Sequence, residues 1–335
     1  MGARVTSDAD VSRETSSLNG PAELHDSPIA RAARQAIEVK SGGLTMPRPR
    51  HRRVFSVANQ KGGVGKTTST VNVAAALALA GLSVLVVDLD PQGNASTALA
   101  VDRSMGTPSI YEVLLGELTA AEAVQTCPYA PRLGCIPATI DLAGAEIELV
   151  SMVARETRLK KALLEVADSY DYIFVDCPPS LGLLTVNALV ATEEVLIPIQ
   201  CEYYALEGLG QLLRNIDLVK QHLNPSLDVS TILLTMYDGR TKLADQVAHE
   251  VREHFGTKVL ETVIPRSVKV SEAPGFGQSV LTYDPGSRGA MSYLDAAREI
   301  ADRGAGTGPG DTGSGGTSAD HITTTAATNG AEESA

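Results

Sequence analysis

The stretch Asn59-Gln-Lys-Gly-Gly-Val-Gly-Lys-Thr-Thr68 decides how the rest of this sequence is interpreted. An apolar run, residues 54–58, precedes it and is typical of a buried strand. A segment rich in small residues, 67–80, follows it and is typical of a helix. A glycine-rich turn between a strand and a helix N-terminus directs backbone N–H groups and the positive end of the helix dipole at one point. The stretch therefore predicts a phosphate-binding loop.

The residue types of this loop fit a nucleotide bound with Mg²⁺. Lys66 is placed to reach the terminal phosphates, and the Thr67 hydroxyl is placed where the metal ion would lie. The general phosphate-loop pattern requires glycine at the position of Gln60, and this sequence has a second lysine, Lys61, beside it. The nucleotide-binding residues that we predict in the loop are Lys61, Gly62, Gly63, Val64, Gly65, Lys66, Thr67 and Thr68.

The chain alternates between aliphatic and helical segments from residue 54 to residue 303, with no linker-like break. Near-continuous aliphatic strands separated by helices are the mark of a parallel sheet covered on both faces. We therefore expect a single α/β P-loop NTPase domain with a mostly parallel, twisted sheet over 54–303. The expected strands are 54–59, 84–89, 133–137, 172–176, 194–199, 230–235 and 258–264, and the expected helices are 67–80, 109–116, 144–168, 184–190, 206–222, 243–255 and 288–302.

The two ends of the chain differ in composition from this domain. Residues 1–53 are rich in Ser, Asp, Glu, Gly and Ala, and residues 304–335 are rich in Gly, Ser and Thr. We predict a mostly disordered arm and a disordered tail, with one short helix over residues 30–40. The basic cluster at 47–53 is either a solvated linker or a contact for nucleic acid or a partner.

Composition limits the classes of function. The chain has 335 residues, a net charge of −12 and no Trp, so any nucleic-acid contact has to come from a local basic patch. Its cysteines show no C-x-x-C or zinc-like spacing, as expected for reduced thiols. No signal-peptide segment and no apolar run of about 20 residues is present, which predicts a cytoplasmic protein with no membrane contact.

Carboxylates follow two of the expected strands. Asp88 and Asp90 end the strand at 84–89, and because they are two residues apart they share a face. Asp176 ends the strand Tyr172-Ile-Phe-Val-Asp, the usual place of a metal-holding carboxylate in phosphoryl transfer. A carboxylate at a strand end is common, and it becomes informative here because the phosphate loop accompanies it.

The variant loop Lys-Gly-Gly-Val-Gly-Lys-Thr-Thr, followed by Asp88-Leu-Asp-Pro-Gln-Gly-Asn94, resembles the deviant Walker A and A′ motifs of the ParA/MinD family of ATPases. The resemblance implies that Asp90 orients the attacking water and that Asp88, with Thr67 and Asp176, supports Mg²⁺. It also implies that Lys61 reaches the phosphates of a second subunit, as an arginine finger does, in a homodimer formed with ATP. Lys61 and Asp90 are thus the predicted catalytic residues.

Three further segments resemble the chromosome-partitioning branch of this family: Gln200–Gly208, Leu234–Arg240 and Ile264–Pro274. The resemblance places the adenine near Met236, Pro265 and Ser267. It also implies that Arg240 and Arg266 contact DNA without sequence preference, although solvated surface charge explains them nearly as well. No chemistry follows from the residue types of 200–208, where a structural contact at the dimer face is the simpler interpretation.

The resemblance implies an ATPase that partitions DNA, associates with the nucleoid, and is stimulated by a ParB-type centromere-binding partner. A MinD-like membrane-cycling ATPase is one alternative, but the helix expected at 288–302 is acidic and not basic and amphipathic. An iron–sulfur reductase relative would need matched cysteines at the dimer interface, and the sequence shows no such pair. A nucleotide-gated scaffold without turnover is the third alternative, and Asp90 and Lys61 weigh against it.

Overall fold

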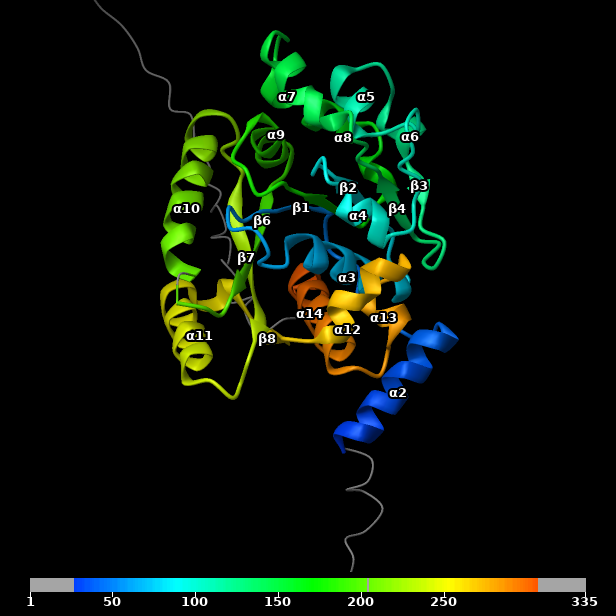
Figure 1. The fold of residues 1–335 in the computed structure, drawn as a ribbon, viewed down its shortest axis with the longest axis vertical. Helices are drawn as coiled ribbons and strands as arrows, with labels where there is room; N and C mark the ends of the chain where they lie inside the picture. Colours follow the sequence, from blue (N-terminus) through cyan, green and yellow to red (C-terminus); the bar gives the residue numbers. More distant parts are fainter. Residues whose placement is uncertain (1–26, 204, 307–335) are drawn as a thin grey trace, which may run out of the picture.

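The computed structural model describes residues 27–203 and 205–306, which form a single α/β unit around an eight-stranded sheet (Figure 1). The strand order is β3-β4-β2-β5-β1-β6-β7-β8, and every pairing is parallel except that of β3 with β4. The strands are β1 (Arg53–Val57), β2 (Val84–Asp88), β3 (Gln125–Thr126), β4 (Leu133–Ile136), β5 (Tyr172–Asp176), β6 (Glu194–Gln200), β7 (Asp228–Tyr237) and β8 (Val259–Pro265).

Helices cover both faces of this sheet, and alternate residues of each strand enter one of two cores. In β1, Val54 packs into one core and Phe55 into the other. The first core includes side chains of α5 (Ile110–Leu115), α7 (Leu142–Val150), α8 (Arg158–Leu164), α9 (Leu183–Ala191), α10 (Ala205–His222) and α11 (Lys242–Phe255). The second core includes side chains of α2 (Pro28–Ser41), α3 (Lys66–Leu79), α4 (Asn94–Ala98), α12 (Val268–Glu272), α13 (Val280–Tyr283) and α14 (Arg288–Ala305). Figure 1 shows α3, α13 and α14 on the opposite side of the sheet from α5, α8 and α9.

This strand order decides where the predicted motifs meet. β1 lies in the middle of the sheet between β5 and β6, and β5 also pairs with β2. The carboxyl ends of β1, β2 and β5 are therefore neighbours, and the segments that follow them open on one edge. That edge is where open parallel sheets bind ligands.

The long helix expected at 144–168 is interrupted. The structure instead has α7, a short 3₁₀ turn at Arg155–Thr157, and α8. Ala154 adopts φ +55°, a left-handed conformation that no helix interior contains, so the chain turns there. The two-residue strand β3 and the short helices α12 and α13 were also not predicted, because each is too short to show a periodic pattern.

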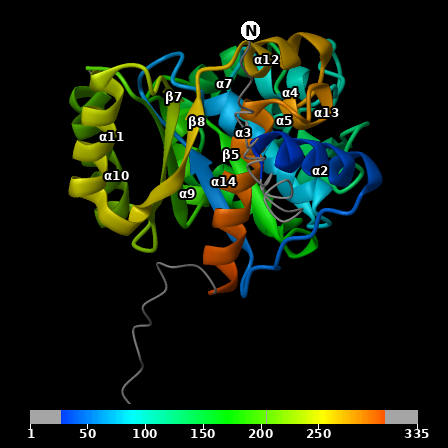
Figure 2. The same ribbon diagram turned by 90° about the horizontal axis from the view of Figure 1, so that it is seen from below.

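Residues 27–53 differ from the disordered arm that the composition suggested. They contain α2, capped by Ser27 at its start and by Gly42 at its end, followed by an extended segment. Leu44 and Met46 of that segment are buried in the second core. Figure 2 shows α2 lying alongside the rest of the molecule. The part of the arm expected to be disordered before residue 27, and the tail after residue 306, lie outside the described residues.

The basic cluster at 47–53 is largely occupied by contacts with the domain. Arg52 pairs with Asp168 at 2.8 Å, and Arg53 donates to both carboxylate oxygens of Glu194 at 2.7 and 2.5 Å. Arg53 also donates to the carbonyl oxygen of Ile300 at 2.8 Å. Burial alone would lower the pKa of Arg53, but the hydrogen bonds and the charge of Glu194 raise it. Arg53 thus fastens the start of β1 to β6 and α14.

Replacing Arg53 tests this fastening. Arg53→Ala leaves the Glu194 carboxylate largely buried without its partner, so we expect the free energy of unfolding to fall by about 3 kcal/mol in urea denaturation. Arg298→Ala breaks an exposed pair with Asp295 and should cost less than about 1 kcal/mol. Equal losses in the two variants would contradict a structural role for Arg53.

Candidate nucleotide-binding site

The predicted phosphate loop forms the wall of a cavity of about 260 Å³ at the carboxyl edge of the sheet. The loop joins β1 to α3, and helix α3 begins at Lys66. The cavity brings together residues from four separate segments of the chain. They are Gly62, Gly63, Gly65, Lys66, Thr67, Thr68, Asp90, Gln92, Asn94, Pro179 and Met236.

Two glycines of the loop are required by the backbone conformation. Gly63 has φ +75° and Gly65, directly before α3, has φ +91°, both in the left-handed region that side chains disfavour. Val64 between them is buried, and its carbonyl oxygen accepts a hydrogen bond of 2.8 Å from the Thr235 hydroxyl. This bond ties the loop to β7 and leaves the Val64 side chain in the interior.

Lys66 is buried beneath the loop with only 7% of its surface exposed. Its Nζ lies 3.4 Å from the carbonyl oxygen of Lys61 and donates a hydrogen bond to it. Burial lowers the pKa of Lys66, while the nearby charges of Asp176 and Asp90 act in the opposite direction. A buried ammonium at the N-terminus of a helix adds to the positive end of the helix dipole. The arrangement favours an anion in the cavity.

Asp88 and Asp176 lie opposite one another at the ends of β2 and β5. Both are fully buried, and burial first, then the charge of Asp88, raises the pKa of Asp176 to about 8. Burial also raises the pKa of Asp88, to about 6, although Ser96 partly offsets this by donating its N–H and its hydroxyl to Asp88 Oδ2 at 2.8 and 2.6 Å. Two adjacent buried carboxylates attract a cation.

One oxygen of this pair is left without a partner. Asp176 Oδ1 accepts a hydrogen bond of 3.0 Å from the Thr70 hydroxyl, whereas Oδ2 is buried and has no hydrogen-bond partner among the described residues. Such an atom is costly unless something binds it. The described residues contain no group of three His, Cys, Asp or Glu side chains arranged to hold a metal. Mg²⁺ needs no such group, because it is usually held by one or two carboxylates, waters and substrate phosphates. Asp176, Asp88 and the nearby Thr67 therefore fit Mg²⁺.

Asp90 lies at the edge of the cavity and is 8% exposed. Its Oδ1 accepts a hydrogen bond of 3.0 Å from the backbone N–H of Gln92, which fixes the turn before α4. Four residues at or beside the site were not predicted: Gln92, Asn94, Pro179 and Ser96. The first three lie in the motifs that follow Asp90 and Asp176, so their position after a strand end was an available signal.

The remaining predicted site residues lie outside the cavity lining, except for Met236. Pro265 ends β8 and is paired with Tyr237 of β7, so Ser267 follows at the same edge of the sheet. Arg240 is 88% exposed and makes a two-pronged ion pair with Asp238, and Arg266 is 61% exposed. Whether Met236, Pro265 and Ser267 contact adenine, and whether the arginines contact DNA, stays a prediction.

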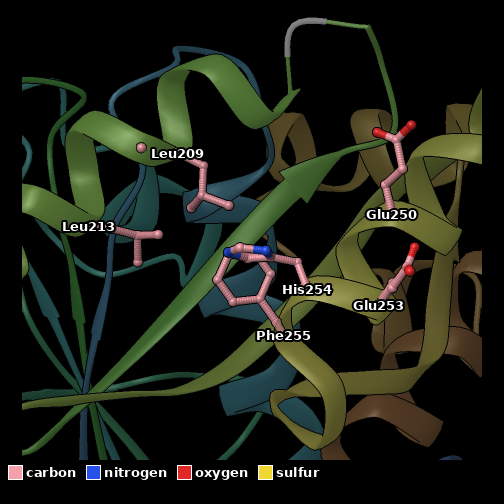
Figure 3. A pocket seen from close by; sticks show the side chains of 7 residues that line it. Leu209, Leu213, Glu250, Glu253, His254 and Phe255 are labelled. Carbon is pink, nitrogen blue, oxygen red and sulfur yellow. The ribbon is translucent and has the colours of Figure 1, made fainter.

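A larger cavity, of about 540 Å³, lies between α10 and α11 (Figure 3). Leu209 and Leu213 face it from α10, and His254 and Phe255 come from the end of α11. None of the predicted site residues lines it, and its charged lining is Glu250 and Glu253. A phosphate would be repelled there, so cavity size alone would have pointed to the wrong place.

Comparison with known proteins shows the family of this chain. The model of the family described as an AAA domain matches residues 52–229. The chain is 52% identical over 252 residues to the sporulation initiation inhibitor protein Soj of Bacillus subtilis (strain 168), covering 75% of this chain and 99% of Soj. It is 53% identical over 252 residues to the chromosome partitioning protein ParA of Myxococcus xanthus (strain DK1622), covering 75% of this chain and 88% of that one.

The chain belongs to the ParA/MinD family of ATPases. The prediction of this family, and of its chromosome-partitioning branch, is confirmed, as is the single α/β P-loop fold. Among solved structures of the same fold, the cell division ATPase MinD of Pyrococcus furiosus matches with a TM-score of 0.61 and 28% identity, over 75% of this chain and 99% of that one.

A second solved structure is more similar in sequence. Cobyrinic acid a,c-diamide synthase of Mycobacterium smegmatis, solved with bound ADP and magnesium, matches with a TM-score of 0.66 and 39% identity over 75% of this chain and 95% of that one. Its name refers to a different reaction from that of the ParA relatives. Soj of Bacillus subtilis and ParA of Myxococcus xanthus are 52% and 53% identical to this chain, so the partitioning branch of the family is the better guide to this member.

None of the helices in the described part of the chain is long and apolar enough to cross a membrane. The four cysteines, Cys127, Cys135, Cys177 and Cys201, are free and buried. Burial raises the pKa of each thiol, so none has the exposed, electropositive surroundings of a reactive thiolate.

The pKa of Asp176 leads to a pH prediction for the metal-free protein. The folded-state pKa lies above the ordinary carboxyl value near 4, so the unfolded chain releases this proton first and stability falls as the pH rises toward 8. Asp176→Asn cannot ionise and escapes this loss. In urea denaturation with EDTA, its stability advantage over wild type should grow between pH 5 and pH 8 by on the order of 2 kcal/mol.

The same variant, Asp176→Asn, tests metal binding separately from the titration of Asp176. Saturating Mg²⁺ and ATP should raise the melting temperature of the wild type more than that of Asp176→Asn, because the amide is a poorer ligand for a hard cation. The difference between wild type and variant cancels the titration of groups that do not interact with residue 176, so it reports the titration of Asp176 together with that of the neighbouring Asp88. A difference in unfolding free energy that stays constant or shrinks with pH would show that the folded chain does not raise the pKa of Asp176.

Proposed function

We propose that this chain is an ATPase that partitions chromosomal DNA, and that it hydrolyses ATP to ADP and phosphate at the cavity beside α3. The observation that carries the proposal is a phosphate loop with two lysines, placed beside three carboxylates at one edge of the sheet. The identity of about 50% to relatives named ParA and Soj supports the partitioning role.

The proposed binding roles follow the geometry. The backbone of Gly62, Gly63, Val64 and Gly65 curls around the phosphates, Lys66 neutralises them from below, and the Thr67 and Thr68 hydroxyls lie at the helix start. Mg²⁺, when bound, supplies charge neutralisation of the phosphates. Asp176, Asp88 and Thr67 hold it, and the unpaired Asp176 Oδ2 is the atom most in need of it.

For hydrolysis we propose two residues. Asp90 lies at the cavity edge, where its carboxylate can orient a water and accept its proton. Lys61 is at the mouth of the loop with its side chain 36% exposed, while Lys66 already occupies the interior. Lys61 therefore contacts the phosphates bound by a second copy of the chain. ATP stabilises a homodimer in which each copy supplies its Lys61 to the other's site.

DNA contact and partner choice complete the proposal. Arg240 and Arg266 are exposed at the same edge as the cavity and contact the DNA backbone of the nucleoid without reading its sequence. A ParB-type centromere-binding protein stimulates an otherwise slow turnover.

The adenine lies against Met236, Pro265 and Ser267, and Met236 has φ +50°, a strained conformation that a functional contact would explain.

Lys61→Ala tests the dimer. Without the second copy's ammonium, we expect ATP-dependent dimers to disappear in size-exclusion chromatography and DNA-stimulated turnover to fall at least about 100-fold, because a charge supplied in trans is worth at least this much. ATP binding by the isolated chain should persist, since Lys66 and the glycines remain. Lys160→Ala, an exposed lysine of α8, is the control and should resemble wild type. Normal dimers and turnover in Lys61→Ala would refute the assignment.

The DNA contact is tested by Arg240→Glu with Arg266→Glu. The double variant should bind random duplex DNA at least about tenfold more weakly with ATP, and the slope of log affinity against log salt should become shallower by roughly one for each arginine–phosphate pair removed. Lys160→Glu with Lys161→Glu makes the same charge change on α8 and should retain most of the affinity. Undiminished binding by the arginine variant would leave both arginines as solvated surface charge.

Phosphate release distinguishes this proposal from the scaffold alternative. A chain that dimerises and binds DNA but releases no phosphate with DNA and partner present would be a nucleotide-gated scaffold. Co-sedimentation with anionic vesicles in the presence of ATP would instead favour a MinD-like cycle.

A further inference from the structure

Glu202 pairs with two cations, one that we assigned to dimer formation and one that we assigned to DNA contact. It belongs to the segment 200–208, for which the sequence offered no chemistry, and it comes directly after β6 at the carboxyl edge of the sheet. Its carboxylate is 45% exposed and faces two cations from two other parts of the chain. One belongs to the phosphate loop, and the other follows β8.

The distances show that one carboxylate serves both cations. Glu202 Oε2 lies 3.3 Å from Lys61 Nζ, and Oε1 lies 3.6 Å from Arg266 Nη2. The side-chain amide of Gln200 donates a hydrogen bond to Oε1 and orients the carboxylate. The N–H of Lys61 donates to Asn59 Oδ1 at 3.0 Å, so the backbone that carries Lys61 is held independently of Glu202.

These two cations are the ones to which we assigned contacts with phosphates outside their own chain. Lys61 would reach the nucleotide of a second copy, and Arg266 would contact DNA. Within a single chain the Glu202 carboxylate pairs with both, and it has to release Lys61 before that ammonium reaches across to a partner. A carboxylate and a phosphate compete for the same cation by the same charge and hydrogen-bond chemistry.

We propose that Glu202 is an autoinhibitory counter-ion that pairs with Lys61 and Arg266 of its own chain and opposes both homodimer formation and DNA contact. The inference rests on the proposed function, because it needs Lys61 to act across the dimer and Arg266 to act on DNA. Half-exposed ion pairs of this kind shift an equilibrium by only about twofold to fivefold. Glu202 therefore sets a threshold for assembly and does not block it.

Glu202→Gln removes the charge and keeps the size of the side chain. With ATP, we expect the dimer dissociation constant, measured by analytical ultracentrifugation, to fall about twofold to fivefold. Affinity for random duplex DNA should rise by a similar factor, and both gains should shrink above about 0.5 M salt. Turnover by fully dimeric protein should equal that of wild type, because Glu202 orients neither nucleotide nor water. An unchanged melting temperature would show that the variant folds normally.

Asp228→Asn is a matched control. Asp228 also bridges two cations, Lys220 at 3.2 Å and Lys258 at 2.9 Å, but it begins β7 and so lies at the opposite edge of the sheet. It gives the same change in net charge without touching the proposed surface. Its dimer and DNA dissociation constants should match those of wild type. A gain in Asp228→Asn equal to that in Glu202→Gln would reduce the effect to net charge and overturn the proposal.

The variant Arg266→Ala separates the effect of Glu202 on dimer formation from its effect on DNA binding. In Arg266→Ala, the additional change Glu202→Gln should still strengthen the dimer, but at protein concentrations where both forms are fully dimeric it should no longer strengthen DNA binding. If wild type forms ATP-dependent dimers that bind DNA and Glu202→Gln changes neither, the counter-ion proposal alone is wrong. If wild type forms no such dimers, the proposed function is wrong and the counter-ion role is overturned with it.

Discussion

Two carboxylates, Asp88 and Asp176, are fully buried where adjacent strands of one sheet end, and the rest of the site is arranged around this buried pair. Parallel strands bring their carboxyl ends to one edge, so the pairing of β2 with β5 places the two charges opposite each other. Ser96 donates a hydrogen bond to Asp88, and Thr70 donates one to Oδ1 of Asp176. Oδ2 of Asp176 has no hydrogen-bond partner among the residues that the structure describes. The fold thus keeps an energetically costly arrangement that a divalent cation relieves.

Most of the fold and the centre of this site could be predicted from the sequence, because both depend on local patterns. Aliphatic runs locate seven of the eight strands, and the glycine and lysine spacing of 59–68 locates the loop. Asp88, Asp90 and Asp176 could be chosen because each follows an aliphatic strand. That choice requires only that parallel strands end together, which is a property of the architecture and not of this chain.

What could not be predicted depends on contacts between distant residues. The cluster at 47–53 was expected to be either a solvated linker or a contact for nucleic acid or a partner, but Arg53 pairs with Glu194, 141 positions away in the same chain. The Lys61 pair with Glu202 spans the same separation, and no local pattern indicates either. The role of Ser96 also required the folded chain, since this residue of α4 reaches Asp88 only once the helix is packed against the end of β2. The short helix expected at 30–40 is present as α2, but its docking could not be predicted, because a few apolar side chains are enough to dock a helix and they barely change the composition of a polar segment.

The charged side chains of the site pair with one another within the chain. The charges of Asp176 and Asp90 act on Lys66 where a phosphate would, and Glu202 pairs with Lys61 at the mouth. Burial, and then the charge of Asp88, raises the pKa of Asp176. A phosphate alone would add negative charge beside those carboxylates, and a divalent cation alone would add positive charge beside the lysines. Neither ligand fits well without the other, so the arrangement of charges favours joint binding of Mg²⁺ with nucleotide over binding of either alone.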